Sequence, residues 1–326
     1  MKRASNALLR SGNLVKEVIV GVVGAGVFGG YHAQKYAVLP GVRIGAVHDI
    51  DAARAGALAA LHGAAPYTNY DEFLGAVDAA TIAAPATVHY ELSHRALEAG
   101  RHILIEKPIA LSLDQADRLI DAAARRSLVV QVGHQERFVV DAFGLLARTQ
   151  KPRSITCIRR NPATGRGEDV SVVLDLMIHD LDLVRRMALG DIVSMASTCD
   201  ADEAEAKIVC SDGVSAYFEA SRCSQIYDRR MILSYDDGSI EIDFVKRTVS
   251  NTTSTPLPAC AASGANGAVV DPLGLSVALF VSAVRGDMAC AIPAREARAA
   301  LEWALLVEEA SKLAASRQSR PMRARA

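Results

Sequence analysis

Three residues carry side chains whose types and spacing suit proton transfer. Asp175 and His179 lie four residues apart in a largely apolar segment, so a helix would place them on one face. A carboxylate at that spacing can orient an imidazole and raise its basicity. Lys107 follows an apolar run and precedes Pro108, which ends a strand ladder. The residues alone leave a structural alternative open for each group. Lys107 could belong to an exposed ion pair at the strand end, and His179 could be a hydrogen-bonded histidine in the core.

A glycine-rich loop predicts a binding site for a dinucleotide. The apolar run Val18–Val23 leads into Gly24-Ala25-Gly26-Val27-Phe28-Gly29, which is G-x-G-x-x-G between a predicted strand and a predicted helix. Gly24 would permit the tight turn, Gly26 would let the backbone approach a pyrophosphate, and Gly29 would allow close helix packing. Backbone N–H groups at the helix start, including those of Val27 and Phe28, would bind the phosphates.

The choice between two dinucleotides depends on Asp49, which closes the second predicted strand 20 residues after Gly29. A carboxylate at this position accepts hydrogen bonds from ribose hydroxyls and repels a 2′-phosphate, so we expect NAD rather than NADP. Arg54 would suit the phosphate, but we interpret it as a solvated charge on the next helix.

The elements that position these residues fall into two predicted domains. Residues 17–134 alternate β-rich runs with Ala-rich helical stretches, which is typical of βαβ units and a parallel sheet, an α/β Rossmann domain. The strand ends of such a sheet face the ligand crevice, so Lys107 should point toward the cofactor. The predicted strands are Val18–Val23, Arg43–His48, Ala79–Ala83, Ile103–Glu106 and Leu128–Gln131, and the predicted helices are Gly29–Val38, Ala52–Leu61, Asp71–Leu74, His89–Ala99 and Leu113–Arg126.

Residues 135–316 follow a different pattern, which predicts an α+β domain with a mainly antiparallel open sheet. Several segments with period-2 alternation follow one another across short turns, without helices between them. Thr248–Ala268 is interpreted as a loop, and the last helix is expected to pack on the first domain. The predicted strands here are Ile155–Arg159, Ala206–Cys210, Val214–Ser221, Arg229–Ser234 and Gly238–Phe244, and the predicted helices are Val170–Leu189, Pro272–Val284 and Ala294–Ala315.

Composition and charge exclude several classes of protein. The net charge of −1, the single Trp and the lack of a basic tract among aromatics argue against a nucleic-acid partner. No apolar run approaches the roughly 20 residues that span a membrane. The six cysteines show no metal spacing, so we expect a cytoplasmic protein with no metal.

Residues 1–16 and 317–326 are interpreted as an N-terminal extension and a basic tail. The open face of the predicted antiparallel sheet predicts a homodimer or homotetramer.

Five motifs in this order resemble the glucose–fructose oxidoreductase/inositol dehydrogenase (Gfo/Idh/MocA) family, whose members are NAD(P)-dependent sugar and cyclitol dehydrogenases. The motifs are Gly24–Gly29 with Asp49, Ala84–His89, Glu106–Pro108, Gly133–Phe138, and Asp175 with His179. The resemblance implies that Lys107 is the active-site lysine, that His179 is the acid/base and that Asp175 is its polar companion. It also implies that the cofactor is bordered by Ala84, Pro85, His89, Glu106 and Lys107. The implied substrate-binding set is Lys107, His134, Glu136, Arg137, Asp175 and His179.

Two segments, Gly133–Phe138 and Val172–Leu183, look like the branch that includes UDP-N-acetylglucosamine 3-dehydrogenases. This likeness implies oxidation of the C3 hydroxyl of a UDP-amino sugar, on the way to a diamino sugar of lipid A. Arg159, Arg160 and Arg166 could meet the nucleotide diphosphate, or lie in a solvated loop. Two other functions remain open: a dehydrogenase or ketoreductase for a free sugar or cyclitol, and a regulator that senses NAD(P) without turnover.

Overall fold

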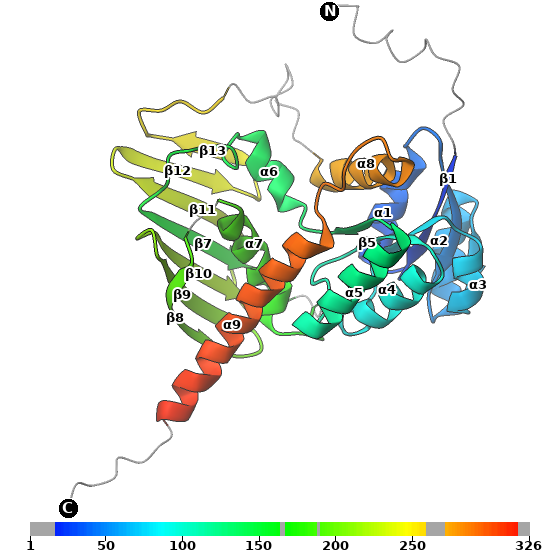
Figure 1. The fold of residues 1–326 in the computed structure, drawn as a ribbon, viewed down its shortest axis with the longest axis horizontal. Coiled ribbons are helices and arrows are strands. Elements are labelled where there is room, and N and C mark those ends of the chain that lie inside the picture. Colours follow the sequence, from blue (N-terminus) through cyan, green and yellow to red (C-terminus); the bar gives the residue numbers. More distant parts are fainter. Residues whose placement is uncertain (1–16, 164–166, 188–189, 259–270, 319–326) are drawn as a thin grey trace, which may run out of the picture.

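The computed structural model describes residues 17–163, 167–187, 190–258 and 271–318. The extension expected at residues 1–16, most of the tail expected at residues 317–326, and Arg166 lie outside the described residues. Within them, two sheets stand side by side, with a long C-terminal helix between them (Figure 1).

The first sheet has six parallel strands in the order β3-β2-β1-β4-β5-β6, so the predicted α/β Rossmann fold is confirmed. Strand order reverses between β1 and β4, which is where such sheets open a crevice for a dinucleotide. The strands are β1 (Val18–Val23), β2 (Val42–His48), β3 (Ala65–Tyr67), β4 (Ala79–Ile82), β5 (His102–Ile105) and β6 (Val130–Val132). The connecting helices are α1 (Val27–Ala37), α2 (Ala52–His62), α3 (Tyr70–Gly75), the 3₁₀ turn η2 (Ala86–Val88), α4 (His89–Glu98) and α5 (Leu113–Arg126). Ser112 caps α5 as predicted, because its side chain accepts a hydrogen bond from the Gln115 amide.

The second sheet has seven strands in the order β13-β12-β11-β7-β10-β9-β8 and is mainly antiparallel, as predicted. Its central pair, β7 and β10, is parallel, because a helical crossover and two further strands separate them in the chain. The strands are β7 (Ser154–Arg160), β8 (Ile192–Cys199), β9 (Glu203–Cys210), β10 (Ser215–Ser221), β11 (Asp228–Tyr235), β12 (Gly238–Asp243) and β13 (Thr248–Asn251). The helices that follow β6 in the chain are α6 (Glu136–Ala142), the π-helical segment η3 (Val173–Met177), α7 (Ile178–Arg186), α8 (Pro272–Arg285) and α9 (Ala294–Gln318). Of these, α8 packs on α1 of the first half.

Several elements differ from the predictions. The strands β3, β8 and β13 and the short helix α6 were not predicted, and Thr248–Asn251 pairs with β12, so the loop interpretation is wrong there. β8 escapes detection because its buried and exposed residues do not alternate. The predicted single helix Val170–Leu189 is instead a π-helical segment followed by α7.

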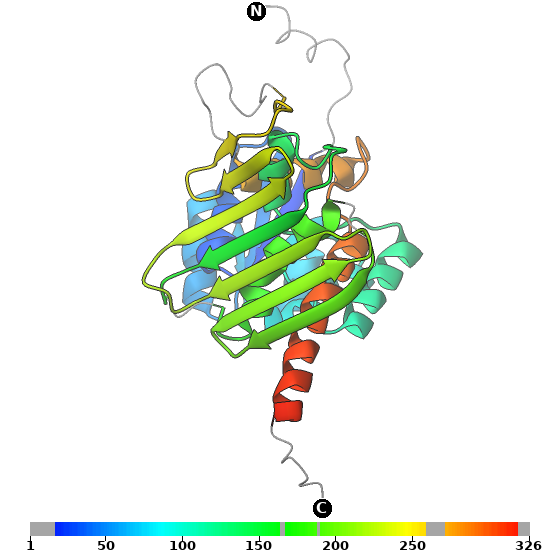
Figure 2. The same cartoon turned by 90° about the vertical axis from the view of Figure 1, so that its left-hand side faces the viewer.

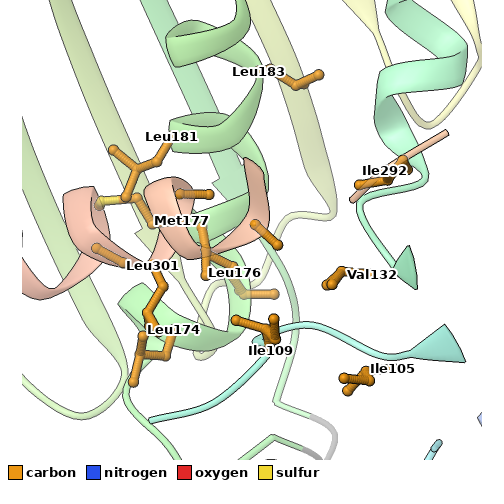
Figure 3. Close-up of a cluster of buried hydrophobic side chains, with 14 of the residues drawn as sticks. Ile105, Ile109, Val132, Leu174, Leu176, Met177, Leu181, Leu183, Ile292 and Leu301 are labelled. Carbon is orange, nitrogen blue, oxygen red and sulfur yellow. The ribbon is translucent and has the colours of Figure 1, made fainter. Parts of the chain in front are cut away.

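Helix α9 joins the two halves. It packs on β8 and α7 of the second half and on α5 and β6 of the first, which explains its diagonal course in Figure 1. Figure 3 shows part of the shared core, in which Leu174 and Met177 of η3 belong to one buried cluster with Leu301 of α9 and Ile109 after β5. This continuous packing fixes η3 against the end of the parallel sheet.

The outer face of the seven-stranded sheet is not covered by any described helix (Figure 2). Assembly of a homodimer or homotetramer through this face therefore stays a prediction. In the described part of the chain, no helix has the length and apolar character needed to cross a membrane.

Candidate active site

The glycine loop between β1 and α1 has the geometry that a dinucleotide needs. Gly24 has φ of +92°, and a Cβ there would lie 2.5 Å from the Ala83 carbonyl oxygen. A Cβ on Gly29 would lie 1.8 Å from the Gly24 carbonyl oxygen, so close packing of loop and helix requires this glycine. A Cβ on Gly26 would meet no atom within 4 Å, which leaves room for a pyrophosphate against the backbone. The residues present therefore fit an NAD phosphate group.

The two residues between the last two glycines, Val27 and Phe28, are about half exposed at the N-terminus of α1. Their backbone N–H groups belong to the first turn of the helix, where no intrahelical acceptor is available. This placement suits the phosphate-binding role that the sequence predicts for them.

Asp49 follows β2 and is buried beside the same loop. Its Oδ2 accepts a hydrogen bond from the Ala25 amide at 2.8 Å, and its Oδ1 accepts one from the Asp51 amide at 2.9 Å. Arg54 is 54% exposed, as expected of a solvated charge, but its Nη2 also lies 2.8 Å from Asp49 Oδ1. Burial alone would raise the pKa of Asp49, but the hydrogen bonds from Arg54, Asp51 and Ala25 outweigh it and lower the pKa. Asp49 is therefore held as a carboxylate.

His89 links the chain segments that follow β4 and β5. Its Nδ1 lies 2.7 Å from the Pro108 carbonyl oxygen, and its Nε2 lies 2.9 Å from the Ala84 carbonyl oxygen. The ring is buried, and burial lowers the pKa of His89 despite these two carbonyl contacts. The imidazole therefore faces the protein interior and positions the Ala84–Pro85 segment, rather than lining an open groove.

Glu106 is also buried and is tied to the cofactor helix. Its Oε1 lies 2.7 Å from His32 Nε2 and accepts a hydrogen bond from Gln135 Nε2 at 2.9 Å. A Cβ on Gly133 would lie 2.6 Å from Glu106 Oε2, so this glycine makes room for the carboxylate. His32 was not predicted as a site residue. The available signal was its place three residues after Gly29, on the buried face of α1.

Lys107, directly after β5, reaches across to the second half of the chain. Its Nζ donates hydrogen bonds to the Asp175 carbonyl oxygen at 2.5 Å and to Asp175 Oδ1 at 2.8 Å. The two side chains are 15% and 19% exposed, so this is a largely buried ion pair rather than the exposed one that the sequence left open. The Lys107–Pro108 peptide bond is cis.

His179 is the second residue of α7, which follows the π-helical segment directly. The expected contact of Asp175 with His179 is not present, because Asp175 binds Lys107 and the His179 Nδ1 is buried without a hydrogen-bond partner. The reason is local: η3 has i→i+5 hydrogen bonding, so its wider turns shift residues four apart out of α-helical alignment. Burial, followed by the charges of Lys107 and Arg159, holds the pKa of His179 well below its ordinary value. The imidazole is therefore neutral at physiological pH.

His134 lies next to His179, with the ring centroids 6.4 Å apart in an edge-to-face arrangement. Its side chain is almost fully buried, and neither ring nitrogen has a hydrogen-bond partner among the described residues. Burial is the main reason why the pKa of His134 is also lowered. His134 therefore adds a second neutral imidazole to the site.

Glu136 and Arg159 form a buried ion cluster beneath His179. The Arg159 Nη1 lies 2.8 Å from Glu136 Oε1, and its Nε and Nη2 lie 2.9 and 2.7 Å from the carboxylate oxygens of Asp180. Arg159 is 1% exposed, so its predicted place in a solvated loop or on a diphosphate is wrong. The guanidinium is fully occupied by two carboxylates, while Arg160 pairs with Glu219 on the other face of β7.

Arg137 is not brought to the site. It is 5% exposed, its Nε and Nη2 bind the Asp182 carboxylate at 2.6 and 2.5 Å, and its Nη1 binds Glu296 of α9. With its donors occupied in the interior, Arg137 stabilises the packing of α6, α7 and α9. We therefore remove it from the predicted substrate-binding set.

The described residues contain no cluster of His, Cys, Asp or Glu that could hold a metal ion. What the structure brings together is an ammonium group, Lys107, and two neutral imidazoles, His179 and His134, at the carboxyl end of a sheet that fits a dinucleotide. A neutral imidazole can accept a proton from a hydroxyl, and an ammonium group can stabilise the oxyanion that forms.

Comparisons with known proteins identify relatives that are dehydrogenases. Residues 18–134 match an oxidoreductase family described by its NAD-binding Rossmann fold. The UDP-N-acetylglucosamine 3-dehydrogenase of Acidithiobacillus ferrooxidans is 36% identical over 237 residues, which cover 70% of this chain and 75% of that protein. The inositol 2-dehydrogenase 3 of Saccharopolyspora erythraea is 32% identical over 191 residues, covering 54% of this chain and 55% of that protein.

Solved structures show the same architecture. The crystal form P21 of the A. ferrooxidans dehydrogenase superposes with a TM-score of 0.82 at 30% identity, over 91% of this chain and 98% of that one. The WlbA dehydrogenase of Bordetella pertussis, solved with NADH and UDP-GlcNAcA, superposes with a TM-score of 0.81 over 92% of this chain and 96% of that one. Its identity of 16% supports the shared fold alone.

Proposed function

The chain belongs to the Gfo/Idh/MocA family of NAD-binding oxidoreductases, and from this premise we propose that it oxidises the C3 hydroxyl of UDP-N-acetylglucosamine to a ketone. The ketone product is the substrate class that an aminotransferase needs to make a diamino sugar, which we propose serves lipid A synthesis. The likeness to the A. ferrooxidans enzyme, which spans three quarters of that protein, supports the choice of sugar.

One observation carries the catalytic part of the proposal. Lys107 Nζ is bound to the carbonyl and carboxylate oxygens of Asp175, in the π-helical segment that leads into His179. The positive charge of Lys107 lies close enough to His179 to lower the pKa of its imidazole. These observations support the proposal that an ammonium group and a neutral base act on the same substrate oxygen.

His179 and Lys107 have separate roles: His179 accepts the substrate proton, and Lys107 stabilises the charge on the substrate oxygen. His179 Nδ1 is buried without a partner, which leaves Nε2 to accept the proton of the substrate hydroxyl. The Lys107 ammonium group stabilises the negative charge that develops on the same oxygen, and Asp175 holds that ammonium group in place. When bound by the glycine loop and Asp49, NAD supplies the hydride acceptor.

A second candidate is a dehydrogenase of a free sugar or cyclitol. The observation in its favour is the 32% identity to an inositol 2-dehydrogenase. The same Lys107 and His179 chemistry would serve any secondary hydroxyl, so the two candidates differ only in how the rest of the substrate is recognised.

The test is a comparison of substrates with NAD in excess and hydroxylamine present to trap the ketone. We expect NADH formation with UDP-N-acetylglucosamine and none with N-acetylglucosamine plus UDP, because the nucleotide must be covalently attached to the sugar. NADH formation with myo-inositol or N-acetylglucosamine instead would favour the second candidate. Tight NAD binding without turnover of any sugar would favour a regulator that senses the cofactor.

A further inference from the structure

Arg229, in β11, is a cation whose ion pair with Glu136 is long, at 4.0 Å. Its Nε and Nη2 donate to the Asn161 Oδ1, each at 3.2 Å, and this acceptor is a neutral amide. The Glu136 Oε1 lies 4.0 Å from Arg229 Nη1, which is longer than a hydrogen bond. Among the residues that the structure describes, no carboxylate accepts a hydrogen bond from Arg229.

The neighbouring arginines differ in this respect. Arg159, which is paired with Arg229 across the sheet, is bound by the carboxylates of Glu136 and Asp180. Arg230, the next residue in β11, is bound by Asp228 at 2.8 Å. Two like charges directly opposite each other on adjacent strands repel. Glu136 and Asp180 both hydrogen-bond to Arg159, whereas Arg229 has only the longer contact with Glu136. Burial, followed by this repulsion, lowers the pKa of Arg229.

Arg229 lies at the edge of the proposed active site. Its Nη1 lies 4.0 Å from Glu136 Oε1, and Arg159, its partner across the sheet, binds Asp180, the residue after His179. The Arg229 side chain is 26% exposed, and its charge contributes to the lowered pKa of His179. The ring of Tyr227 covers the guanidinium at 4.9 Å and is itself half exposed, so the arginine is held between the interior and solvent. The guanidinium is therefore partly accessible to a ligand from solvent.

We propose that Arg229 binds the diphosphate group of a nucleotide-sugar substrate and so determines specificity for nucleotide sugars over free sugars. A guanidinium pairs with phosphate oxygens through two parallel hydrogen bonds, and a doubly charged ligand would replace the neutral Asn161 amide. In a UDP-sugar the diphosphate is attached at C1, two carbons from the C3 hydroxyl, so both groups can be held by adjacent parts of one site. This inference rests on the proposed function and adds the recognition of the anion.

The experiment measures UDP binding separately from catalysis. Calorimetric titration of the NADH-bound enzyme with UDP, and with uridine as a ligand that has no phosphate, is carried out on wild type, Arg229→Gln, Arg229→Lys and Arg230→Gln. Arg230→Gln is the matched control, because Arg230 points to the opposite face of the same strand and is paired with Asp228. Melting temperatures of all four proteins identify any variant that fails to fold.

We expect Arg229→Gln to weaken UDP binding by about 10- to 100-fold, the range for losing a charge-assisted pair. Arg229→Lys should lie between Arg229→Gln and wild type, while uridine binding and the Arg230→Gln variant should be unchanged. With UDP-N-acetylglucosamine as substrate, KM should rise by the same factor as the UDP dissociation constant, with little change in kcat. Equal UDP affinity in wild type and a folded Arg229→Gln variant would overturn the inference, as would a wild-type enzyme that does not bind UDP.

The failure of the proposed function gives a different result. A wild-type enzyme that binds UDP through Arg229 but forms no NADH from UDP-N-acetylglucosamine would contradict the proposed oxidation and leave the diphosphate site supported. A wild-type enzyme that oxidises this substrate, with a KM that Arg229→Gln leaves unchanged, would support the proposed oxidation and contradict the diphosphate site.

Discussion

Lys107 Nζ lies 2.8 Å from Asp175 Oδ1 and 2.5 Å from the Asp175 carbonyl oxygen, which ties the carboxyl end of β5 to the π-helical segment before His179. This contact joins the sheet that fits the cofactor to the half of the chain that carries His179, the proposed proton acceptor. Asp175 thus acts on Lys107, rather than on His179 as its spacing suggested.

The acid limb of the pH–rate profile should lie below the ordinary pKa of histidine, 6.5. Burial and the charge of Lys107 lower the pKa of His179, so the neutral base persists as the pH falls and is lost only below that lowered pKa. In Lys107→Met, one of the positive charges is gone, so the acid limb should move to higher pH. The measurement is kcat/KM against pH for both proteins. An acid limb above the ordinary value in wild type would show that His179 is not the base.

Two glycine substitutions should separate cofactor binding from folding. Gly26→Ala places its methyl group in open space, so the melting temperature should hold while NAD affinity falls by about tenfold or more, because the pyrophosphate can no longer approach the backbone. Gly29→Ala would place a methyl group against the Gly24 carbonyl, so stability should fall by about 1–3 kcal/mol as well. Thermal melting and NAD titration by fluorescence check both. Unchanged NAD affinity in Gly26→Ala would place the pyrophosphate elsewhere.

Replacing Asp49 with Ser should shift the cofactor preference toward NADP. The change removes the charge that repels a 2′-phosphate and frees Arg54, now 2.8 Å from Asp49 Oδ1, to bind that phosphate. The ratio of kcat/KM for NADP to that for NAD should rise by at least about tenfold. Asp51→Ser is the control, since Asp51 lies farther from the Arg54 guanidinium, at 3.8 Å, and a serine can still cap α2. An unchanged ratio in Asp49→Ser would remove Asp49 from cofactor selection.

Arg159→Met should destabilise the protein far more than Arg160→Met. The first leaves Glu136 and Asp180 as uncompensated buried charges, at a cost of about 3–5 kcal/mol. The second breaks a partly exposed pair with Glu219, worth about 0–1 kcal/mol. Urea denaturation of both variants gives the two free energies of unfolding. Similar losses would mean that the buried cluster is not what holds α6 and α7 to the sheet.

The sequence was informative where the chemistry is local. The positive φ of Gly24 and the packing of Gly29 on the Gly24 carbonyl arise within six residues, so the loop and the Rossmann fold could be predicted together. The place of Lys107 followed from the rule that parallel strands end at the ligand crevice.

The sequence was uninformative where contacts join distant segments. The pairing of Lys107 with Asp175 spans 68 positions, and that of Glu106 with His32 spans 74, so no local pattern records them. The π-helical segment was missed because its apolar residues also fit an α-helix. Arg137 and Arg159 carry the residue type that binds substrate anions, but tertiary packing supplies their carboxylate partners.

The central claim is that Lys107 and His179 act on one substrate oxygen. The most direct test is a double-mutant cycle of Lys107→Met and His179→Asn, with single-turnover NADH formation from UDP-N-acetylglucosamine. Lys151→Met is the control for loss of a lysine, because Lys151 pairs with Asp212 at the surface, away from the site. We predict that each single variant loses about 10²-fold or more in rate and that the double variant is little slower than the slower single one, as for residues that act as a unit. Losses that multiply in the double variant would show that the two residues act independently and would contradict the shared site.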